Sequence, residues 1–255
     1  MSQEEQRVMV EFDFTGRRYV VTGASSGIGR AIALRLASSG AAILAVARRE
    51  AELRTLAQEC PGQIEWAAVD VTDSASLATA LEAFGAKGKI HGSVHAAGFA
   101  AFSPLRAFEK RQAEAMMAVS LWAGVELVRI LSRKKYAAAG AAHLFLASVA
   151  AERGQIGLSA YGATKSAVVG AVRSLSRELA RQGGRINALS PGWVDTSLTK
   201  GAQDYTLQHR EVMEAAHPLG LGQEEYIVQP ALFLLSDGAK WMTGANVVVD
   251  GGYSA

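Results

Sequence analysis

The sequence predicts an α/β fold in which helices cover both faces of a doubly wound parallel sheet. Apolar segments of strand length alternate with amphipathic segments of helix length along the whole chain. The apolar segments are almost continuously hydrophobic, as in AAILAVA and HLFLAS, which is typical of strands that are covered on both faces. Strands that alternate with helices in this way form parallel sheets, because each helix returns the chain to the edge where the previous strand began.

Seven segments are expected to be strands and six to be helices. The strands are 18–22, 42–47, 64–69, 90–95, 142–147, 185–190 and 246–250. The helices lie near 27–39, 50–58, 74–84, 106–135, 159–182 and 224–236. We expect residues 1–13 to form an N-terminal arm and residues 14–255 to form one domain. Residues 195–223 interrupt the alternation with a long polar stretch, which predicts a lid over a binding site.

The composition is that of a globular protein with no marked charge. Of the 255 residues 49% are hydrophobic, and 26 lysines and arginines nearly balance 24 aspartates and glutamates, which disfavours disorder and a polyanionic partner. Cys60, the single cysteine, cannot form an internal disulfide. The sequence contains no metal-ligand cluster and no nucleic-acid motif. Its polar start and the lack of a long apolar segment predict neither a secretion signal nor a membrane span, so we expect a soluble cytoplasmic protein.

The stretch TGASSGIG at 22–29 joins the first strand to the first helix, and it has two interpretations. GASSG fits the G-x-S-x-G turn that exposes the nucleophilic serine of a hydrolase, which would be Ser25. In that hydrolase fold, however, the turn follows strands that supply an oxyanion-hole loop, and at most one strand precedes Ser25. The hydrolase interpretation is therefore disfavoured.

The second interpretation is phosphate binding. The stretch has the spacing T-G-x-x-x-G-x-G, and glycines at the start of a helix let a pyrophosphate reach the unpaired backbone N–H groups there. The two serine hydroxyls can donate to phosphate oxygens. We favour this interpretation. The residues expected to contact a dinucleotide are Gly23, Ser25, Ser26, Gly27, Ile28 and Gly29.

The end of the second strand indicates which dinucleotide is bound. Arg48 follows Gly29 by nineteen residues, at the strand end where a dinucleotide fold holds the adenosine ribose. An acidic residue there binds the 2′-hydroxyl of NAD, whereas an arginine suits the 2′-phosphate of NADP, because a guanidinium pairs strongly with phosphate. We therefore predict NADP(H), held by Arg48 and Arg49. The alternative is a solvated helix start in which both arginines pair with Glu50 or Glu52.

The motif YGATK predicts acid–base chemistry. Tyr161 and Lys165 are four residues apart in a strongly helical stretch, so they share one helix face. A tyrosine has an ordinary pKa near 10, and a nearby ammonium lowers that pKa by favouring the phenolate. The pair therefore predicts a tyrosine that exchanges a proton near neutral pH. Ser148 ends the strand HLFLAS, at the sheet edge where ligands bind, and its hydroxyl can donate to a carbonyl oxygen.

Together these motifs resemble those of the short-chain dehydrogenase/reductase family. The resemblance extends over residues 14–254 and also includes DVTD at 70–73, AAG at 96–98, SPGWVDT at 190–196 and TGANVVVDGGY at 243–253. It implies one Rossmann-like domain with a seven-stranded parallel sheet, usually in a homodimer or homotetramer. It also implies that Tyr161 exchanges a proton with a ketone or alcohol, that Lys165 holds the nicotinamide ribose and tunes Tyr161, and that Ser148 positions the substrate oxygen.

By the same resemblance, further residues contact the cofactor. Asp70 and Val71 would contact adenine, while Ala97 and Gly98 would line the cofactor cleft. A segment that packs on the nicotinamide would contribute Pro191, Gly192, Val194 and Thr196. The implied reaction is hydride transfer by the nicotinamide.

Two positions depart from the family pattern. The family commonly has NAG or NNAG after the fourth strand, where this chain reads HAAG at 95–98. His95 either replaces an asparagine that pins the neighbouring backbone or is a buried, hydrogen-bonded histidine, and we favour the second. Ser120 stands where many members carry an asparagine that helps to hold a water of the proton relay. A serine can still bind a water, so we predict an active enzyme with Ser120 in a rearranged relay; the alternative is a weakly active or non-catalytic dinucleotide-binding protein with a structural or regulatory role.

The substrate is predicted only by class. The motifs HPLGLGQEEYI and VDGGY look most like the 3-oxoacyl-acyl-carrier-protein reductase branch, so we expect a ketone, an alcohol or an acyl thioester. Small ketones, keto-sugars and secondary metabolites stay open. An acidic carrier protein would need a basic face, although a solvated helix surface explains the two candidate clusters equally well. The clusters are Arg129, Arg133, Lys134 and Lys135, and Arg173, Arg177 and Arg181.

Other residues are expected around the substrate or between subunits. The candidates for the pocket border are Phe99, Phe102, Arg153, Gln155 and Ile156, and those for the lid are Trp193, Tyr205, Leu207, His209, Met213 and His217. The helix 106–135 is too long and too apolar for a half-buried helix. It predicts packing against a symmetry mate and hence a homotetramer, with a homodimer as the alternative.

Overall fold

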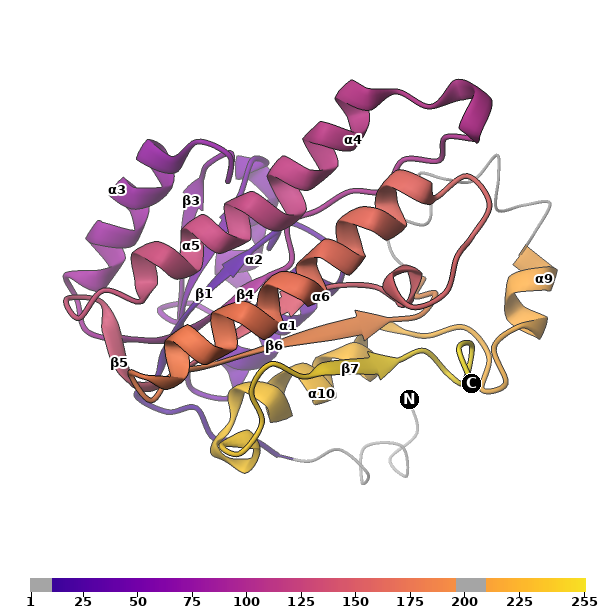
Figure 1. Cartoon of the computed structure of the whole chain (residues 1–255). Coiled ribbons are helices and arrows are strands. Elements are labelled where there is room, and N and C mark those ends of the chain that lie inside the picture. The colour runs from indigo at the N-terminus through magenta and orange to yellow at the C-terminus, as the bar shows by residue number, and fades with distance from the viewer. Residues whose placement is uncertain (1–10, 196–209) are drawn as a thin grey trace.

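A seven-stranded parallel sheet forms the middle layer of the protein (Figure 1). The computed structural model describes residues 11–195 and 210–255. The strands are β1 (Arg18–Thr22), β2 (Ala42–Ala47), β3 (Ile64–Ala68), β4 (Ile90–His95), β5 (Ala137–Leu146), β6 (Arg185–Pro191) and β7 (Asn246–Val249). They lie in the order β3-β2-β1-β4-β5-β6-β7, and every neighbouring pair is parallel. The predicted single domain with a doubly wound seven-stranded sheet is confirmed.

Helices form the two outer layers (Figure 1). One face of the sheet is covered by α1 (Gly27–Ser38), α2 (Glu50–Glu59) and α10 (Glu224–Leu235), and the other by α3 (Ser74–Gly85), α4 (Lys110–Met117), α5 (Ala123–Leu131) and α6 (Ser159–Ala180). A short helix, α9 (Arg210–Ala215), precedes α10. Successive residues of one strand serve both faces: Ile43 of β2 packs with the α1 side and Leu44 with the α3 side. Both faces of the sheet are therefore covered by helices and shielded from solvent, which explains why the strand sequences are almost continuously apolar.

All seven strands end at the same edge of the sheet, which we name the carboxyl edge. The chain changes direction across the sheet between β1 and β4, because β2 and β3 lie on one side of β1 while β4 to β7 follow on the other. In open α/β sheets this reversal leaves a crevice at the carboxyl edge where ligands bind. The fold thus fixes where a site is expected before any side chain is considered.

The predicted helix 106–135 is wrong in its bounds and in its continuity. A 3-10 turn, η2 (Leu105–Ala107), precedes α4, and a π-helical segment, η3 (Ala118–Trp122), separates α4 from α5. After η3 the Ala123 N–H donates to the Ala118 carbonyl, five residues back instead of four. The spacing of apolar residues in the sequence cannot reveal a single π-helical turn, because the side chains before and after the turn still follow a helical pattern.

Other element bounds differ less. β5 begins at Ala137 instead of 142, and its register against β4 shifts between Ile90 and Gly92. The residues added to the strand are small, so their sequence does not carry the strand signal of the apolar run that follows. The helix α9 was not predicted and lies within the stretch 195–223 that was expected to be a lid. The other predicted helices and strands begin at the predicted residue and end within two residues of the predicted one.

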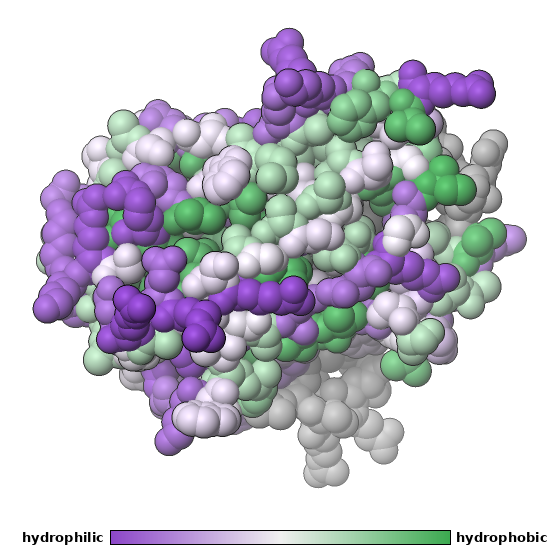
Figure 2. All heavy atoms as spheres, in the orientation of Figure 1, coloured by the Kyte–Doolittle hydropathy of each residue, from purple (hydrophilic) through white to green (hydrophobic). Residues whose placement is uncertain are grey.

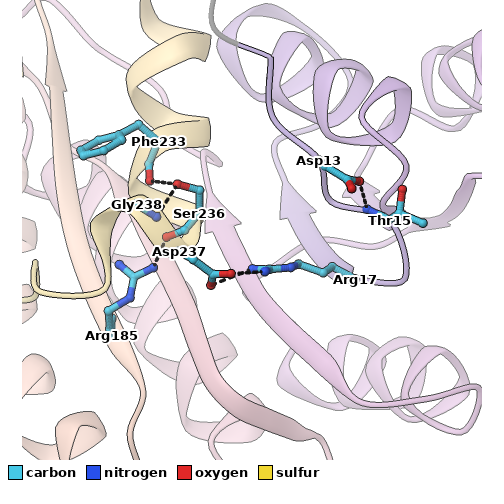
Figure 3. Close-up of polar contacts among 8 residues, drawn as sticks. All are labelled: Asp13, Thr15, Arg17, Arg185, Phe233, Ser236, Asp237 and Gly238. Carbon is cyan, nitrogen blue, oxygen red and sulfur yellow. Dashed lines mark hydrogen bonds and ion pairs between the residues drawn. The ribbon is translucent and has the colours of Figure 1, made fainter.

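At the opposite edge, which we name the amino edge, charged side chains are paired with the protein itself (Figure 3). Arg17, just before β1, donates to both carboxylate oxygens of Asp237, at 3.2 and 2.5 Å. Arg185, the first residue of β6, is buried, and its guanidinium donates to three backbone carbonyls at 2.9–3.4 Å. Those carbonyls belong to Leu234, Ser236 and Met242. The turn η5 (Asp237–Ala239) and the end of α10 are fastened to the sheet in this way.

The helix layer nearest the viewer carries an apolar surface. Figure 2 shows a stretch of pale to dark green over α4 and the neighbouring part of α6, whereas hydrophilic side chains gather on the left, where α5 ends. Trp122 of η3 is 59% exposed, and together with Met117 and Ala163 it lines a hollow between α4 and α6. An exposed apolar surface of this kind is typical of an interaction site. In the described part of the chain, no helix has the length and apolar character needed to cross a membrane.

Candidate active site

The three predicted catalytic residues come together at the carboxyl edge. Ser148 follows the end of β5 by two residues, and Tyr161 and Lys165 lie in the first two turns of α6. Ser148 begins a 3-10 turn, η4 (Val149–Ala151), and its hydroxyl accepts the Ala150 N–H at 3.2 Å. Because η4 packs against α6, the serine and the tyrosine are held by one compact unit.

Lys165 is buried, and among the described residues two of the three N–H donors of its ammonium meet no acceptor. It is 5% exposed, and its Nζ donates to the Leu146 carbonyl at 2.7 Å and lies 5.6 Å from the centre of the Tyr161 ring. An ammonium has three N–H donors, and within residues 11–195 and 210–255 Leu146 provides the one acceptor that it meets. A buried ammonium with two unused donors is a ready site for ligand hydroxyl groups.

The pKa values of this pair differ from the prediction. Burial raises the pKa of Tyr161 above its ordinary value, and a hydrogen bond with Ser148 lowers it only in part. The predicted net lowering of that pKa by Lys165 is therefore wrong. The physical reason is that loss of solvation opposes the phenolate, while the ammonium donates to the Leu146 carbonyl and lies 5.6 Å from the ring centre. Burial also lowers the pKa of Lys165, to about 8.

The glycine turn between β1 and α1 has the shape that a phosphate needs. Gly23 and Gly27 adopt positive φ values of 68° and 58°, which other residues rarely do. A Cβ on Gly23 would stand 2.7 Å from the Ala96 backbone, and one on Gly29 would stand 2.5 Å from the Gly23 carbonyl oxygen. Ser26 is the N-cap of α1, and its side chain makes no capping hydrogen bond. The first N–H groups of α1 thus lack a side-chain cap, and a pyrophosphate fits this cradle.

The two arginines after β2 lie differently from one another. Arg49 reaches back to the glycine turn, and its Nη2 and Nε donate to the Ser25 hydroxyl at 2.9 and 3.2 Å. It also pairs with Glu52 at 3.3 Å, as the alternative interpretation predicted. Arg48 is exposed, and its charge contributes to the lowered pKa of Asp70, after the hydrogen bonds from Thr72. Both arginines follow the end of β2 at the carboxyl edge, and Arg49 is the one that contacts the glycine turn.

The remaining predicted cofactor residues lie along the same edge. Asp70 follows β3, and its Oδ1 accepts from the Thr72 N–H and hydroxyl at 2.9 and 2.7 Å, while Val71 is buried beside it. After β6, Gly192 donates to the Val249 carbonyl at 2.9 Å. The segment continues through the buried Val194. Pro191 is the last residue of β6. Several predicted residues lie outside the described ones: Thr196, the lid candidates Tyr205, Leu207 and His209, residues 1–10 of the predicted arm 1–13, and residues 196–209 of the predicted lid 195–223.

The backbone at Gly98 lies close to the side chains of Ser120 and Lys165 in the cleft. A Cβ on Gly98 would stand 3.0 Å from Ser120 Oγ and 3.6 Å from Lys165 Nζ. The preceding residue, Ala97, donates to the Thr22 hydroxyl at 3.4 Å. Ser120 is 2% exposed, and among the described residues its hydroxyl has no hydrogen-bond partner. A buried hydroxyl without a partner indicates a place for a water or a ligand atom.

His95 is a buried, hydrogen-bonded histidine, as predicted, and it also pins the neighbouring backbone. Its Nε2 lies 3.0 Å from the Val119 carbonyl, and its Nδ1 lies 2.9 Å from the Thr22 hydroxyl. A carbonyl can only accept, so Nε2 carries the proton and Nδ1 accepts from Thr22. Burial lowers the pKa of His95 to about 4, which keeps the ring neutral.

The sequence analysis did not predict a cluster of side chains around Tyr253. Tyr253, near the C-terminus, stacks on His217 with ring centres 4.5 Å apart, and Arg153 lies over the same tyrosine ring at 4.4 Å. The Gln155 amide donates to the Tyr253 hydroxyl at 3.2 Å, and the Trp193 N–H donates to His217 Nε2 at 3.2 Å. Four of these residues were pocket or lid candidates, but Tyr253, which joins them, was not. The five come from four distant segments, so no local pattern could have shown the cluster.

Comparisons with known proteins agree with this geometry. The sequence model of the family described as enoyl-(acyl carrier protein) reductase matches residues 23–254. L-xylulose reductase from Bos taurus is 33% identical over 248 residues, which cover 96% of this chain and 100% of that protein. The 3-oxoacyl-(acyl-carrier-protein) reductase of Escherichia coli is 30% identical over 242 residues, covering 94% and 98%. A crystal structure of a putative NAD(P)-dependent gluconate 5-dehydrogenase from Beutenbergia cavernae, with NADP bound at low occupancy, matches with a TM-score of 0.86 at 32% identity, covering 96% and 99%.

The chain therefore belongs to the short-chain dehydrogenase/reductase family and is an oxidoreductase. These relatives span almost the whole of its length, as the resemblance over residues 14–254 implied.

Proposed function

We propose that this member of the family is an NADP(H)-dependent carbonyl reductase, which interconverts a ketone and a secondary alcohol. The observation that carries the proposal is the meeting of Ser148, Tyr161 and Lys165 beside a glycine turn that is shaped for phosphates. A phenol and a buried ammonium next to a dinucleotide cradle form a site for proton transfer coupled to hydride transfer. A site for phosphate binding alone would not require the phenol.

The cofactor would be held along the carboxyl edge. The glycine turn would take the pyrophosphate, Asp70 and Val71 would border the adenine, and Lys165 would donate to the nicotinamide ribose. NADP(H) is favoured because Arg48 and Arg49 place two positive charges at the end of β2. The NADP that occupies the gluconate 5-dehydrogenase relative is consistent with this choice.

Each catalytic side chain has a defined task in reduction. Bound NADPH supplies the hydride. Ser148 donates a hydrogen bond to the substrate carbonyl and holds it near Tyr161, which gives its proton to the same oxygen. Burial raises the pKa of Tyr161 and keeps the phenol protonated, as a proton donor must be. The Lys165 ammonium then stabilises the phenolate that remains.

We propose a 3-oxoacyl thioester or a similar ketone with an apolar part as the substrate. The loops after β4 and β5 expose large apolar side chains: Leu105 is 86% exposed and Ile156 is 83% exposed. Phe102 packs over Gly157, which joins the two loops. An apolar rim suits an acyl chain better than a polyol. An acyl carrier protein stays a predicted partner; of the basic clusters, Arg129 is paired with Glu126 at 2.6 Å, whereas Arg173, Arg177 and Arg181 are exposed.

We also propose a homotetramer, or a homodimer as the smaller alternative. The apolar hollow at Trp122, Met117 and Ala163 would be covered by a second copy. A native mass measurement that found only the 26.8 kDa protomer would contradict this assembly.

A second candidate function is a non-catalytic dinucleotide-binding protein in which Ser120 cannot support the proton relay. The observation in its favour is that the buried Ser120 hydroxyl has no hydrogen-bond partner in the part of the chain that the structure describes. It predicts NADPH binding without turnover of any ketone.

One experiment separates these outcomes. NADPH and NADH are titrated into the protein, and NADPH absorbance is then followed with 3-oxoacyl thioesters, small ketones, L-xylulose and other keto-sugars. Turnover by the wild-type protein that is lost in Tyr161→Phe supports the reductase. Cofactor binding without turnover on the whole panel supports the second candidate. If neither coenzyme binds, both functions are wrong.

A further inference from the structure

His95 lies where β4 meets η3, and each of its ring nitrogens is engaged. The Thr22 hydroxyl donates to Nδ1, and Nε2–H donates to the Val119 carbonyl. The ring also packs against Phe145 with centres 5.4 Å apart. The side chain therefore joins the ends of β1 and β4 to the π-helical segment on the neighbouring helix layer.

The helix presents a carbonyl to this ring because of its wide turn. In an α-helix the Ala123 N–H would donate to the Val119 carbonyl, four residues back. Here it donates to Ala118 instead, so the Val119 carbonyl is released from its α-helical partner and accepts from His95. A side chain that enters the hydrogen-bond ladder of a helix is a recognised cause of such distortions.

Gly124 allows the ring to come this close. A Cβ at this position would stand 2.6 Å from His95 Cδ2 and 2.9 Å from Phe145 Cζ. Distances below 3.0 Å do not occur between real Cβ atoms and ring carbons. The helix can therefore approach the histidine only because residue 124 has no side chain.

The turn that His95 holds carries Ser120. Its hydroxyl, which has no hydrogen-bond partner within residues 11–195 and 210–255, lies next to Gly98, on the side of the cleft where Lys165 also lies. Moving η3 into regular α-helical bonding would rotate Ser120 about the helix axis and change its place relative to Lys165.

We propose that His95 is a positioning residue, which holds η3 in its π-helical form and thereby sets the place of Ser120 and of the water that it binds, beside Lys165. The proposal rests on the proposed reductase function for its effect on turnover. The effect on the helix itself can be measured without any turnover.

The test compares two substitutions of the histidine with a matched control. His95→Gln keeps a donor at the place of Nε2, within reach of Val119, whereas His95→Asn keeps only an atom at the place of Nδ1. His143 is the control, because it is also buried, its Nδ1 bonds the Ser93 hydroxyl at 2.8 Å, and its pKa is likewise lowered to about 4 by burial. His143→Asn therefore repeats the chemical change at a histidine of β5 that bonds a side chain of β4 instead of a carbonyl of η3.

We expect His95→Asn to lower kcat about 10²-fold, the size of effect that a misplacement of about 1 Å produces, with the Kd for NADPH unchanged. We expect it also to shift the pH profile of kcat and to change amide hydrogen exchange over 118–124. His95→Gln should resemble the wild-type protein, and His143→Asn should lose stability without a shift in the pH profile.

Two results would overturn the proposal: a wild-type pH profile and wild-type exchange in His95→Asn, or an equal loss of kcat in His95→Asn and His143→Asn. If the wild-type protein binds no dinucleotide, the reductase function fails separately. In that case amide hydrogen exchange over 118–124 is the one test of the proposal. Unchanged exchange in His95→Asn would then show that His95 does not hold η3 in its π-helical form.

Discussion

The two edges of the sheet use their cations in opposite ways. At the amino edge, the Arg185 guanidinium donates to three backbone carbonyls, and Arg17 is held by both oxygens of Asp237. At the carboxyl edge, the equally buried Lys165 meets one carbonyl, and the buried Ser120 hydroxyl meets no partner among the described residues. The guanidinium groups of Arg17 and Arg185 are thus paired within the fold, whereas the Lys165 ammonium keeps donors that meet no acceptor among the described residues. In the part of the chain that the structure describes, buried atoms without a hydrogen-bond partner also occur at the start of β1, at Arg18 Nε and the Tyr19 hydroxyl, so the contrast between the edges lies in the cations and in the crevice that Lys165 and Ser120 face.

This difference shows how a function can be recognised in a fold. Desolvating a polar group without a partner costs about 1–3 kcal/mol, so a stable protein keeps few of them. When several gather at the crevice of a parallel sheet, a ligand is expected to complete them. Substitutions at the amino edge should therefore change stability and leave turnover intact, and substitutions at the carboxyl edge should do the reverse.

The largest effect is expected for Tyr161→Phe. Loss of the phenol hydroxyl should lower kcat by about 10²–10⁴-fold, because this is the usual contribution of a general acid, while the ring keeps its packing and NADPH still binds. NADPH absorbance with the best ketone of the panel measures it. Tyr19→Phe, at a buried tyrosine near the amino edge, is the matched control and should keep wild-type turnover. Turnover of Tyr161→Phe within a few-fold of the wild-type value would contradict the role of Tyr161 as the general acid.

Removing the Arg185 guanidinium should act on stability alone. Arg185→Gln leaves backbone carbonyls unpaired in a buried place, and we expect it to lower the free energy of unfolding by about 2–3 kcal/mol with kcat unchanged. Urea denaturation and NADPH turnover are the two measurements. Arg173→Gln, at an exposed arginine of α6, should change neither. A fall in kcat for folded Arg185→Gln would contradict the division between the edges.

Acid should destabilise the fold through its buried histidines. The folded pKa of His95 and of His143 is about 4, below the ordinary 6.5, so their contribution is fully present above pH 6.5 and is lost as the pH falls towards 4. Between pH 7.5 and 5 this loss is about 2 kcal/mol for each histidine. Urea denaturation at the two pH values measures it. His143→Asn should lose less stability over that interval than the wild-type protein, and an equal loss would show that His143 does not carry the effect.

The smallest effect concerns the choice of coenzyme. Arg48→Ala should weaken NADPH binding about 10-fold and NADH binding much less, because a hydrogen bond between charged groups contributes about 1.5–3 kcal/mol and Arg48 is exposed to solvent. Fluorescence titration with both coenzymes measures the two affinities. Arg54→Ala, which removes an exposed arginine of α2 that pairs with Glu50, is the control. Equal weakening of both coenzymes by Arg48→Ala would refute the preference for NADP(H).

Much of the fold and part of the site could be predicted because they depend on local patterns. The continuous apolar runs located all seven strands, and the spacing of Tyr161 and Lys165 placed them on one helix face. The helix 106–135 could not be divided correctly, because its break at η3 depends on Gly124 and on His95 from a different strand. The pKa of Tyr161 was predicted in the wrong direction, because sequence spacing does not show how deeply the side chain lies or which acceptor the lysine prefers.

The sequence by itself determined the class of fold, the glycine turn and the identity of the residues that gather at the carboxyl edge. Each of these follows from hydrophobic period and residue type, which are properties of single segments. The tertiary structure alone decided which polar groups find partners: Lys165 meets one carbonyl, Arg185 meets three, and Ser120 meets none among the described residues. Hydrogen bonding between distant segments depends on distances of a few tenths of an ångström, and only the packed sheet and helices set those distances.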